Sequence, residues 1–86
     1  MRKLKQTEIE FLTAFQKNGY RYIARDNDEQ LWVFKAKPVK SEKYGVWLED
    51  TDCDYAWLNN HQLKDIVLWK NEEPTLIANL LEEDKQ

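Results

Sequence analysis

Two short apolar segments, residues 20–25 and 31–37, lie on either side of a polar turn at residues 26–30. Such a pattern is typical of a β-hairpin. The turn has no glycine, so we expect a loop of four or five residues in which Asn27 or Asp28 takes a positive φ. Pro38 is expected to end the strand pairing or to mark a sheet edge. The rest of the chain has to pack on this hairpin.

The chain has 86 residues, so residues 1–86 are expected to form a single domain with a small core. Cys53 is the only cysteine, which excludes an internal disulfide and any metal site that needs several thiolates. A core of this size then has to be dense, and four Trp, four Tyr and three Phe residues can supply the buried area.

Helical patterns occur near both ends of the chain. Thr7 and Glu10 have capping-box spacing, apolar residues follow at helical intervals, and Gly19 suits the C′ position, which together predict a helix over residues 7–18. Near the other end, Pro74 follows two acids and precedes an amphipathic segment, which predicts a short helix over residues 74–82.

Three more segments read as strands: residues 44–48, 54–58 and 65–69, with a polar linker at 39–43 and a turn at 49–53. The sequence therefore predicts an α+β fold. In it the N-terminal helix packs on a curved antiparallel meander of four or five strands over residues 20–69, flanked by the short C-terminal helix. An SH3-like, partly open barrel is the alternative.

Few residues are suited to catalysis or metal binding. Asp50, Asp52 and Asp54 have the spacing that opens a calcium loop, but Tyr55 and His61 stand where glycine and glutamate would be needed. His61 is the only histidine, and the two glycines cannot form a phosphate loop. We therefore expect no catalytic residue, no metal and no cofactor, and a protein that is not an enzyme.

The predicted hairpin also combines aromatic and basic side chains, which makes it the candidate binding surface. Four tryptophans inside predicted strands favour core packing, whereas an exposed subset would stack on a base or anchor a protein. A net charge of −3 opposes nucleic-acid binding. The candidate binding residues are Arg21, Arg25, Trp32, Phe34, Lys35 and Lys37.

No apolar run is long enough to cross a bilayer and no signal-like segment follows Met1, so we expect a cytoplasmic protein without a membrane partner. The oligomeric state is open. An exposed edge after Pro38, or an apolar patch at Leu76, Ile77, Leu80 and Leu81, is where a second copy would pair.

Several short motifs follow one another along the chain: Tyr22-Ile23-Ala24-Arg25-Asp26, Leu31-Trp32, Lys37-Pro38, Trp47 and Trp69-Lys70-Asn71-Glu72-Glu73-Pro74. In this order the chain resembles small uncharacterised accessory proteins of phages and prophages of Gram-positive bacteria, over roughly residues 20–77. It departs from them at Glu29 and Gln30, where glycine is expected in the turn, and at Asn71, where an acid is expected.

The resemblance implies a biological setting, the cytoplasm of a bacterial host, and no chemistry. On this basis we expect a non-enzymatic phage or prophage accessory protein that binds a host or phage protein. The alternative is a small nucleic-acid-binding module that uses the aromatic and basic hairpin surface.

Overall fold

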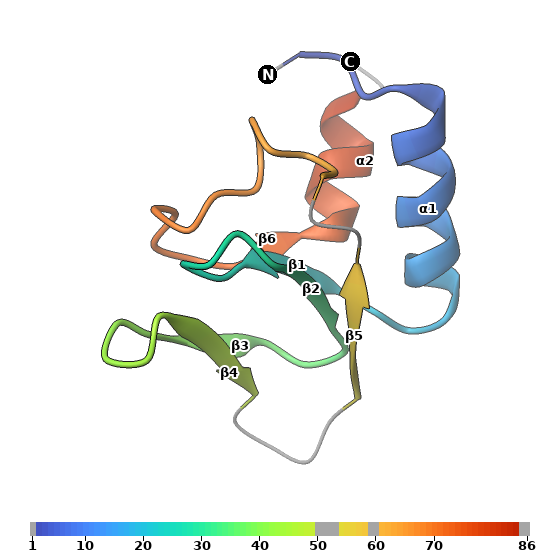
Figure 1. The fold of residues 1–86 in the computed structure, drawn as a ribbon. Coiled ribbons are helices and arrows are strands. Elements are labelled where there is room, and N and C mark those ends of the chain that lie inside the picture. Colours follow the sequence, from blue (N-terminus) through green and yellow to red (C-terminus); the bar gives the residue numbers. More distant parts are fainter. Residues whose placement is uncertain (1, 50–53, 59–60, 85–86) are drawn as a thin grey trace.

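The computed structural model describes residues 2–49, 54–58 and 61–84. Along the chain the elements are α1 (Gln6–Lys17), β1 (Tyr22–Arg25), β2 (Leu31–Phe34), β3 (Pro38–Ser41), β4 (Val46–Glu49), β5 (Tyr55–Leu58), β6 (Thr75–Leu76) and α2 (Ile77–Asp84). This arrangement confirms the predicted α+β fold, with an N-terminal helix, antiparallel strands and a short C-terminal helix (Figure 1).

The strands form two sheets, a four-stranded one in the order β5-β2-β1-β6 and the two-stranded hairpin β3-β4. The strand order therefore differs from the sequential meander that the sequence predicted. After the β3-β4 hairpin the chain returns to pair β5 with β2, and later β6 with β1. These pairings join segments far apart in the chain, which sequential hairpin reasoning does not anticipate.

Helix α1 begins and ends within one residue of the predicted bounds, but its cap differs. The N-cap is Lys5, and the Glu8 carboxylate accepts a 2.7 Å hydrogen bond from the Lys5 amide, so Thr7 and Glu10 are not the capping pair. At the C-terminus Gly19 has a φ of 91°, and the Tyr20 amide donates to the Phe15 carbonyl at 3.0 Å. Together with the 3.0 Å bond from the Gly19 amide to the Gln16 carbonyl, this bond forms a Schellman motif, as the glycine predicted.

The predicted turn between β1 and β2 has five residues, as expected. Its positive φ of 77° falls on Glu29 and not on Asn27 or Asp28. The Asp26 amide donates to the Gln30 carbonyl at 2.8 Å and the Glu29 amide to the Asp26 carbonyl at 3.0 Å. A tight turn followed by one left-handed residue closes the hairpin without glycine.

Two predicted segments have different structures. Residues 39–43 were expected to be a linker, but strand β3 begins at Pro38 and includes part of this segment. Proline has no amide N–H, and this is tolerated at the first position of a strand. Residues 65–69 were expected to be a strand, yet residues 61–70 form turns and a bend. Val67 is buried there and its carbonyl accepts a bond from Arg25, so burial and not strand pairing explains the apolar run.

The C-terminal helix also begins later than predicted, at Ile77 and not at Pro74, because Thr75 and Leu76 first pair with β1. Ile77 and Leu80 are buried in the core. The apolar patch that was considered for pairing with a second copy is therefore largely occupied within the chain. Strand β3, which begins at Pro38, pairs with β4 on one side, and its other side has no strand partner among the described residues.

Each face of the four-stranded sheet has its own cover. The two helices lie against each other and cover one face, and the β3-β4 hairpin lies across the other (Figure 1). The helix-covered face is aliphatic and includes Ile23, Leu31 and Val33. The hairpin-covered face is aromatic, with Phe34 and Trp47 buried and Trp32 half-buried. We call these the aliphatic face and the aromatic face.

Candidate binding site

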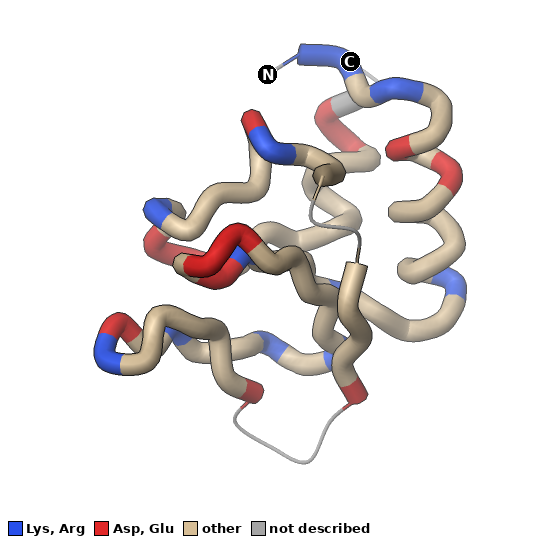
Figure 2. Tube along the Cα trace, in the orientation of Figure 1, with Lys and Arg blue, Asp and Glu red and all other residues tan. Residues whose placement is uncertain are grey.

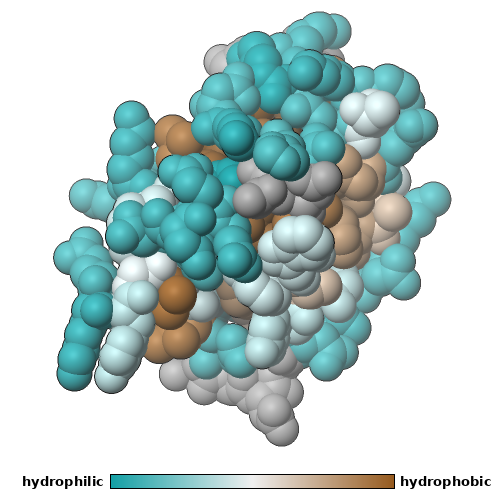
Figure 3. Space-filling view, in the orientation of Figure 1, coloured by the Kyte–Doolittle hydropathy of each residue, from teal (hydrophilic) through white to brown (hydrophobic). Residues whose placement is uncertain are grey.

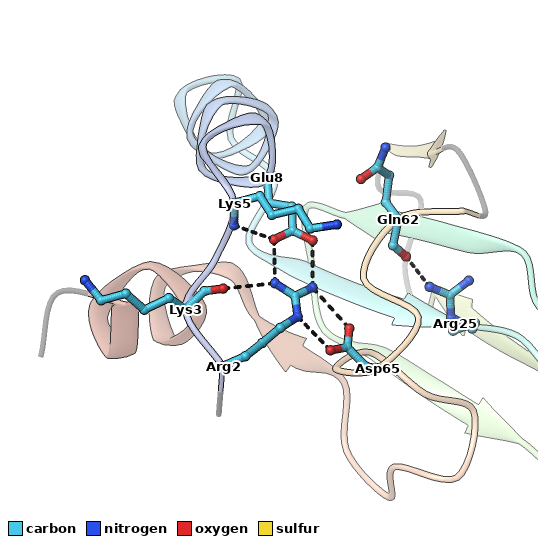
Figure 4. A network of polar contacts seen from close by, with 7 residues as sticks. All are labelled: Arg2, Lys3, Lys5, Glu8, Arg25, Gln62 and Asp65. Carbon is cyan, nitrogen blue, oxygen red and sulfur yellow. Dashed lines mark hydrogen bonds and ion pairs between the residues drawn. The ribbon is translucent and has the colours of Figure 1, made fainter.

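The six predicted binding residues do not form one surface. Residues alternate between faces along a strand, so Trp32 and Phe34 belong to the aromatic face while Arg25 extends from the aliphatic side. Arg25 is only 1% exposed. Its guanidinium donates to the carbonyls of Val67 and Glu29, each at 2.7 Å, and to that of Gln62 (Figure 4). Arg25 therefore connects the β1-β2 turn with the 61–67 loop from the protein interior.

The other basic residues of the set lie near the surface and two of them are paired. Lys35 forms an ion pair with Asp54 at 3.3 Å and lies over the Tyr20 ring. Lys37 forms one with Glu73 at 3.1 Å. Arg21 is exposed, 5.8 Å from the centre of the Tyr22 ring. These cations are spread over the molecule and do not combine with Trp32 and Phe34 into a basic aromatic patch.

A pocket of about 240 Å³ opens on the aromatic face, between the sheet and strand β4. Tyr55 of β5 forms one side, where its ring tilts against Trp32 at a centroid distance of 5.6 Å and stacks on Phe34 at 6.3 Å. The lining residues come from four parts of the chain: Asp26, Trp32, Phe34, Trp47, Leu48, Glu49 and Tyr55. None of them is basic, and two are carboxylates.

Strand β4, which forms the far wall of the pocket, is fixed to the β1-β2 turn by three hydrogen bonds. The Trp47 amide donates to the Asp26 carboxylate at 2.9 Å, and the Trp47 indole donates to the Arg25 carbonyl at 3.0 Å. The Asn27 amide donates to the Gly45 carbonyl at 2.9 Å. A Cβ on Gly45 would lie 3.1 Å from the Asn27 Cβ, so this close approach favours glycine.

Asp26 is the buried charge of the pocket, with 7% of its surface exposed. Burial raises the pKa of its carboxyl, and the hydrogen bond from the Trp47 amide opposes that rise. The Trp32 indole lies close enough to Asp26 to oppose the rise in its pKa as well. The indole N–H nevertheless forms no hydrogen bond within the described residues. The Trp47 amide is thus the hydrogen-bond donor that contacts the buried Asp26 carboxyl in the aromatic pocket.

Among the strands that the structure describes, β5 is an edge of the four-stranded sheet and pairs with β2 alone. The Lys35 amide donates to the Asp54 carbonyl at 3.2 Å, so this opposed pair is a hydrogen-bonded one. Because bonded and non-bonded pairs alternate in an antiparallel ladder, the N–H and C=O groups of Tyr55 and Trp57 point away from β2. Backbone donors and acceptors therefore lie along the free side of β5.

The side chains around this edge are exposed and apolar. Tyr55 is 50% exposed and Trp57 is 56% exposed, and Leu48, which lines the pocket from β4, is 45% exposed. Figure 3 shows apolar atoms at the surface among mostly hydrophilic ones. Acidic residues lie at the β1-β2 turn, the end of β4 and the start of β5 (Figure 2). The surface is thus apolar and bordered mainly by acids, of which Asp54 is paired with Lys35.

The sequence prediction missed Tyr55, Trp57, Leu48 and Glu49 as site residues. It placed residues 54–58 in a strand, and the alternation of two aromatic residues with smaller ones there was an available signal for one exposed aromatic face. The calcium-like triad cannot be compared, because Asp50 and Asp52 lie outside the described residues. Across the part of the chain that is described, no group of three or more acidic, His or Cys side chains gathers for a metal.

Comparison of the chain with protein-family models, with curated proteins and with solved structures finds no match. Within the described residues, neither helix combines the length and the apolar character needed to cross a bilayer. The functional argument therefore depends on the geometry of the pocket and of the β5 edge.

Proposed function

We propose that this protein is a non-enzymatic binding module that captures an extended segment of a partner protein along strand β5. The free side of this strand is the observation that supports the proposal. Its outward N–H and C=O groups at Tyr55 and Trp57 can continue the sheet by adding one strand. The half-exposed rings of the same two residues supply apolar contact area beside that added strand.

The proposed partner is a different protein and not a second copy of this chain. The border of the surface is acidic and the whole chain carries a net charge of −3, so two copies would bring like charges together. A partner segment that is extended and carries positive charge suits the surface better. The phage or prophage setting, drawn from the sequence resemblance, is part of the same proposal.

The alternative function, nucleic-acid binding through the hairpin, has less structural support. Arg25 and Phe34 are buried, and Lys35 and Lys37 are paired with acids, which leaves few free cations beside the exposed rings. A nucleic-acid binder would shift the fluorescence anisotropy of labelled single-stranded and duplex oligonucleotides at low salt. We expect no such shift, and a salt-sensitive one would favour the alternative.

The test selects binding peptides from a displayed random library and then compares two variants at one position. Trp57→Ala removes the ring, whereas Trp57→Pro removes the ring and also the outward N–H, which β2 does not use. We expect Trp57→Ala to weaken the selected peptides about tenfold, and Trp57→Pro to abolish binding while circular dichroism shows an intact fold. Tyr44→Ser is the matched control, because Tyr44 is 68% exposed in the turn between β3 and β4.

Two outcomes would contradict the proposal: a selection that enriches no peptide, or peptides that bind Trp57→Pro as well as Trp57→Ala. Hydrogen exchange provides a readout that does not depend on any variant. The Tyr55 and Trp57 amides should become protected when a selected peptide binds. A dimer that forms through β5 at micromolar concentration, seen by light scattering, would show that a second copy is the occupant.

A further inference from the structure

We infer that the pocket beside β5 binds an arginine side chain of the captured segment. This inference depends on the proposed function for the identity of the segment, but the pocket can be tested without it. The pocket is lined by Asp26, Glu49 and aromatic rings, and it adjoins the strand along which the segment would lie.

The aromatic walls suit a cation. A guanidinium or ammonium group is attracted to the face of an aromatic ring, most strongly to tryptophan. Trp32, Trp47 and Tyr55 approach the pocket from three different strands. The Tyr55 ring is half exposed, so a ligand can reach it from solvent. The flat guanidinium stacks on such rings more readily than the compact ammonium of lysine.

The charges of the pocket are unbalanced in the same direction. Among the described residues that line it, the charged ones are Asp26 and Glu49, and both are acids. Asp26 is buried, and an ionised carboxylate in the interior is stabilised by a nearby cation. Its raised pKa is consistent with a missing positive partner. Arginine presents several N–H donors in a planar fork and can contact a carboxylate while it stacks on a ring.

The geometry of the sheet connects the pocket with the β5 edge. Opposed residues of neighbouring strands project to the same face, as Tyr55 and its partner Phe34 do. A residue of an added strand that pairs with Tyr55 would therefore project to the aromatic face, where the pocket opens. One side chain of the captured segment is thus directed toward Asp26 and Glu49 by strand addition alone.

The direct test titrates N-acetyl-arginine methylamide into the ¹⁵N-labelled protein, with N-acetyl-citrulline methylamide as the neutral isostere. We expect the arginine compound to shift the Trp32 and Trp47 indole N–H resonances with saturation in the millimolar range, and the citrulline compound to leave them unchanged. Glu49→Gln should weaken the arginine compound at least threefold. Glu42→Gln is the matched control, since Glu42 is an exposed acid at the tip of the β3-β4 hairpin. Equal shifts from both compounds, or no effect of Glu49→Gln, would overturn the inference.

The second test uses the selected peptides. We expect them to share one arginine, and its replacement by citrulline to weaken binding about tenfold. Peptides that bind along β5 and tolerate citrulline would overturn the arginine pocket and leave the proposed function standing. Loss of all peptide binding in the selection, with arginine-specific shifts still present, would overturn the proposed function and leave the pocket standing.

Discussion

The two faces of the central sheet differ in composition and in how completely they are covered. On the aliphatic face, Ile23, Leu31 and Val33 have no exposed surface beneath the two helices. On the aromatic face, Trp32 is half-buried and the neighbouring rings of β5 are half exposed. Strand β2 contributes to both faces with consecutive residues. One short strand thus supplies the main core on one side and a partly open pocket on the other.

The difference indicates a division of roles. Close-packed aliphatic side chains stabilise a small domain efficiently because little of their surface remains in water. The aromatic face retains a buried carboxylate at Asp26 and a buried indole N–H at Trp32 that lacks a hydrogen-bond partner within the described residues. Such polar groups weaken a core but suit a ligand site. Four substitutions test this division, and they follow in order of expected effect.

The largest effect is expected for Ile23→Ala on the aliphatic face. Ile23 has 0% exposed surface, and its truncation should lower the free energy of unfolding by about 2–5 kcal/mol. Urea unfolding followed by tryptophan fluorescence measures this. Val39→Ala, at a residue 56% exposed on the β3-β4 hairpin, is the control and should change stability by about 0.5 kcal/mol or less. Similar losses for both would remove the contrast.

The next largest effect is expected for Arg25→Met, which tests whether Arg25 stabilises the fold or binds a partner. The substitution leaves the carbonyls of Glu29, Gln62 and Val67 without their donor, so stability should fall by about 2–3 kcal/mol. Arg21→Met is the control at an exposed arginine. Peptide affinity, measured by calorimetry below the melting temperature, should be unchanged in both variants. Lost affinity with unchanged stability would return Arg25 to the binding site.

A smaller, pH-dependent effect is expected at the start of α1. The Arg2 guanidinium donates to both Glu8 carboxylate oxygens at 2.8 Å, and also to Asp65 (Figure 4). The hydrogen bonds from Arg2 hold the pKa of Glu8 below its ordinary value of 4.5, against the opposing effect of burial. When folding lowers the pKa of an acid, the folded state gains stability at pH values above the pKa of the unfolded chain. That stability is lost as the pH falls through the lower pKa of the folded state.

Glu8→Gln should therefore cost about 1–2 kcal/mol at pH 7. The difference from the unmodified chain should shrink as the pH is lowered below 4.5, the ordinary pKa of this group. Thermal unfolding at pH 7, 4 and 3 measures both quantities. Glu10→Gln, at an exposed residue of the same helix, provides the control. A cost that is independent of pH would mean that shape, and not charge, connects Glu8 to Arg2.

The smallest effect on stability is expected for Trp57→Ala on the open face. Trp57 is 56% exposed, so its truncation should change the free energy of unfolding by about 1 kcal/mol or less. The same substitution is expected to have the larger effect on peptide binding. A loss of several kcal/mol would show that the aromatic face is a second core, and would end the contrast between the two faces.

Local patterns in the sequence predicted the parts of the fold that local interactions determine. The helix before Gly19 and the hairpin over β1 and β2 follow from the positions of apolar, charged and turn residues. The 65–69 segment was misjudged because its β-branched residues satisfy a buried loop as well as a strand, and tertiary contacts decided between the two. Strand β3 was missed because proline and lysine resemble a linker until β4 pairs with them.

The candidate site was predicted only in part, for a related reason. Trp32 and Phe34 are in it, but Tyr55 and Glu49 join them only after β5 crosses back to β2 and the β3-β4 hairpin folds over the sheet. Neither step is visible in a local pattern. The basic residues of the hairpin were assigned to the same surface because alternation alone does not show which cations are neutralised by distant acids, as Lys37 is by Glu73.

The contacts between Lys35 and Asp54 have a consequence for how the β3-β4 hairpin can vary. The chain leaves the sheet after β2 and re-enters it at β5, and these two points are joined by a 3.2 Å backbone hydrogen bond and a 3.3 Å ion pair. The β3-β4 hairpin therefore leaves and rejoins the sheet at adjacent points, so a change in its length need not separate β2 from β5. Since β4 forms one wall of the pocket, replacing this hairpin would give related chains different ligand preferences while the pairing of β2 with β5 is kept.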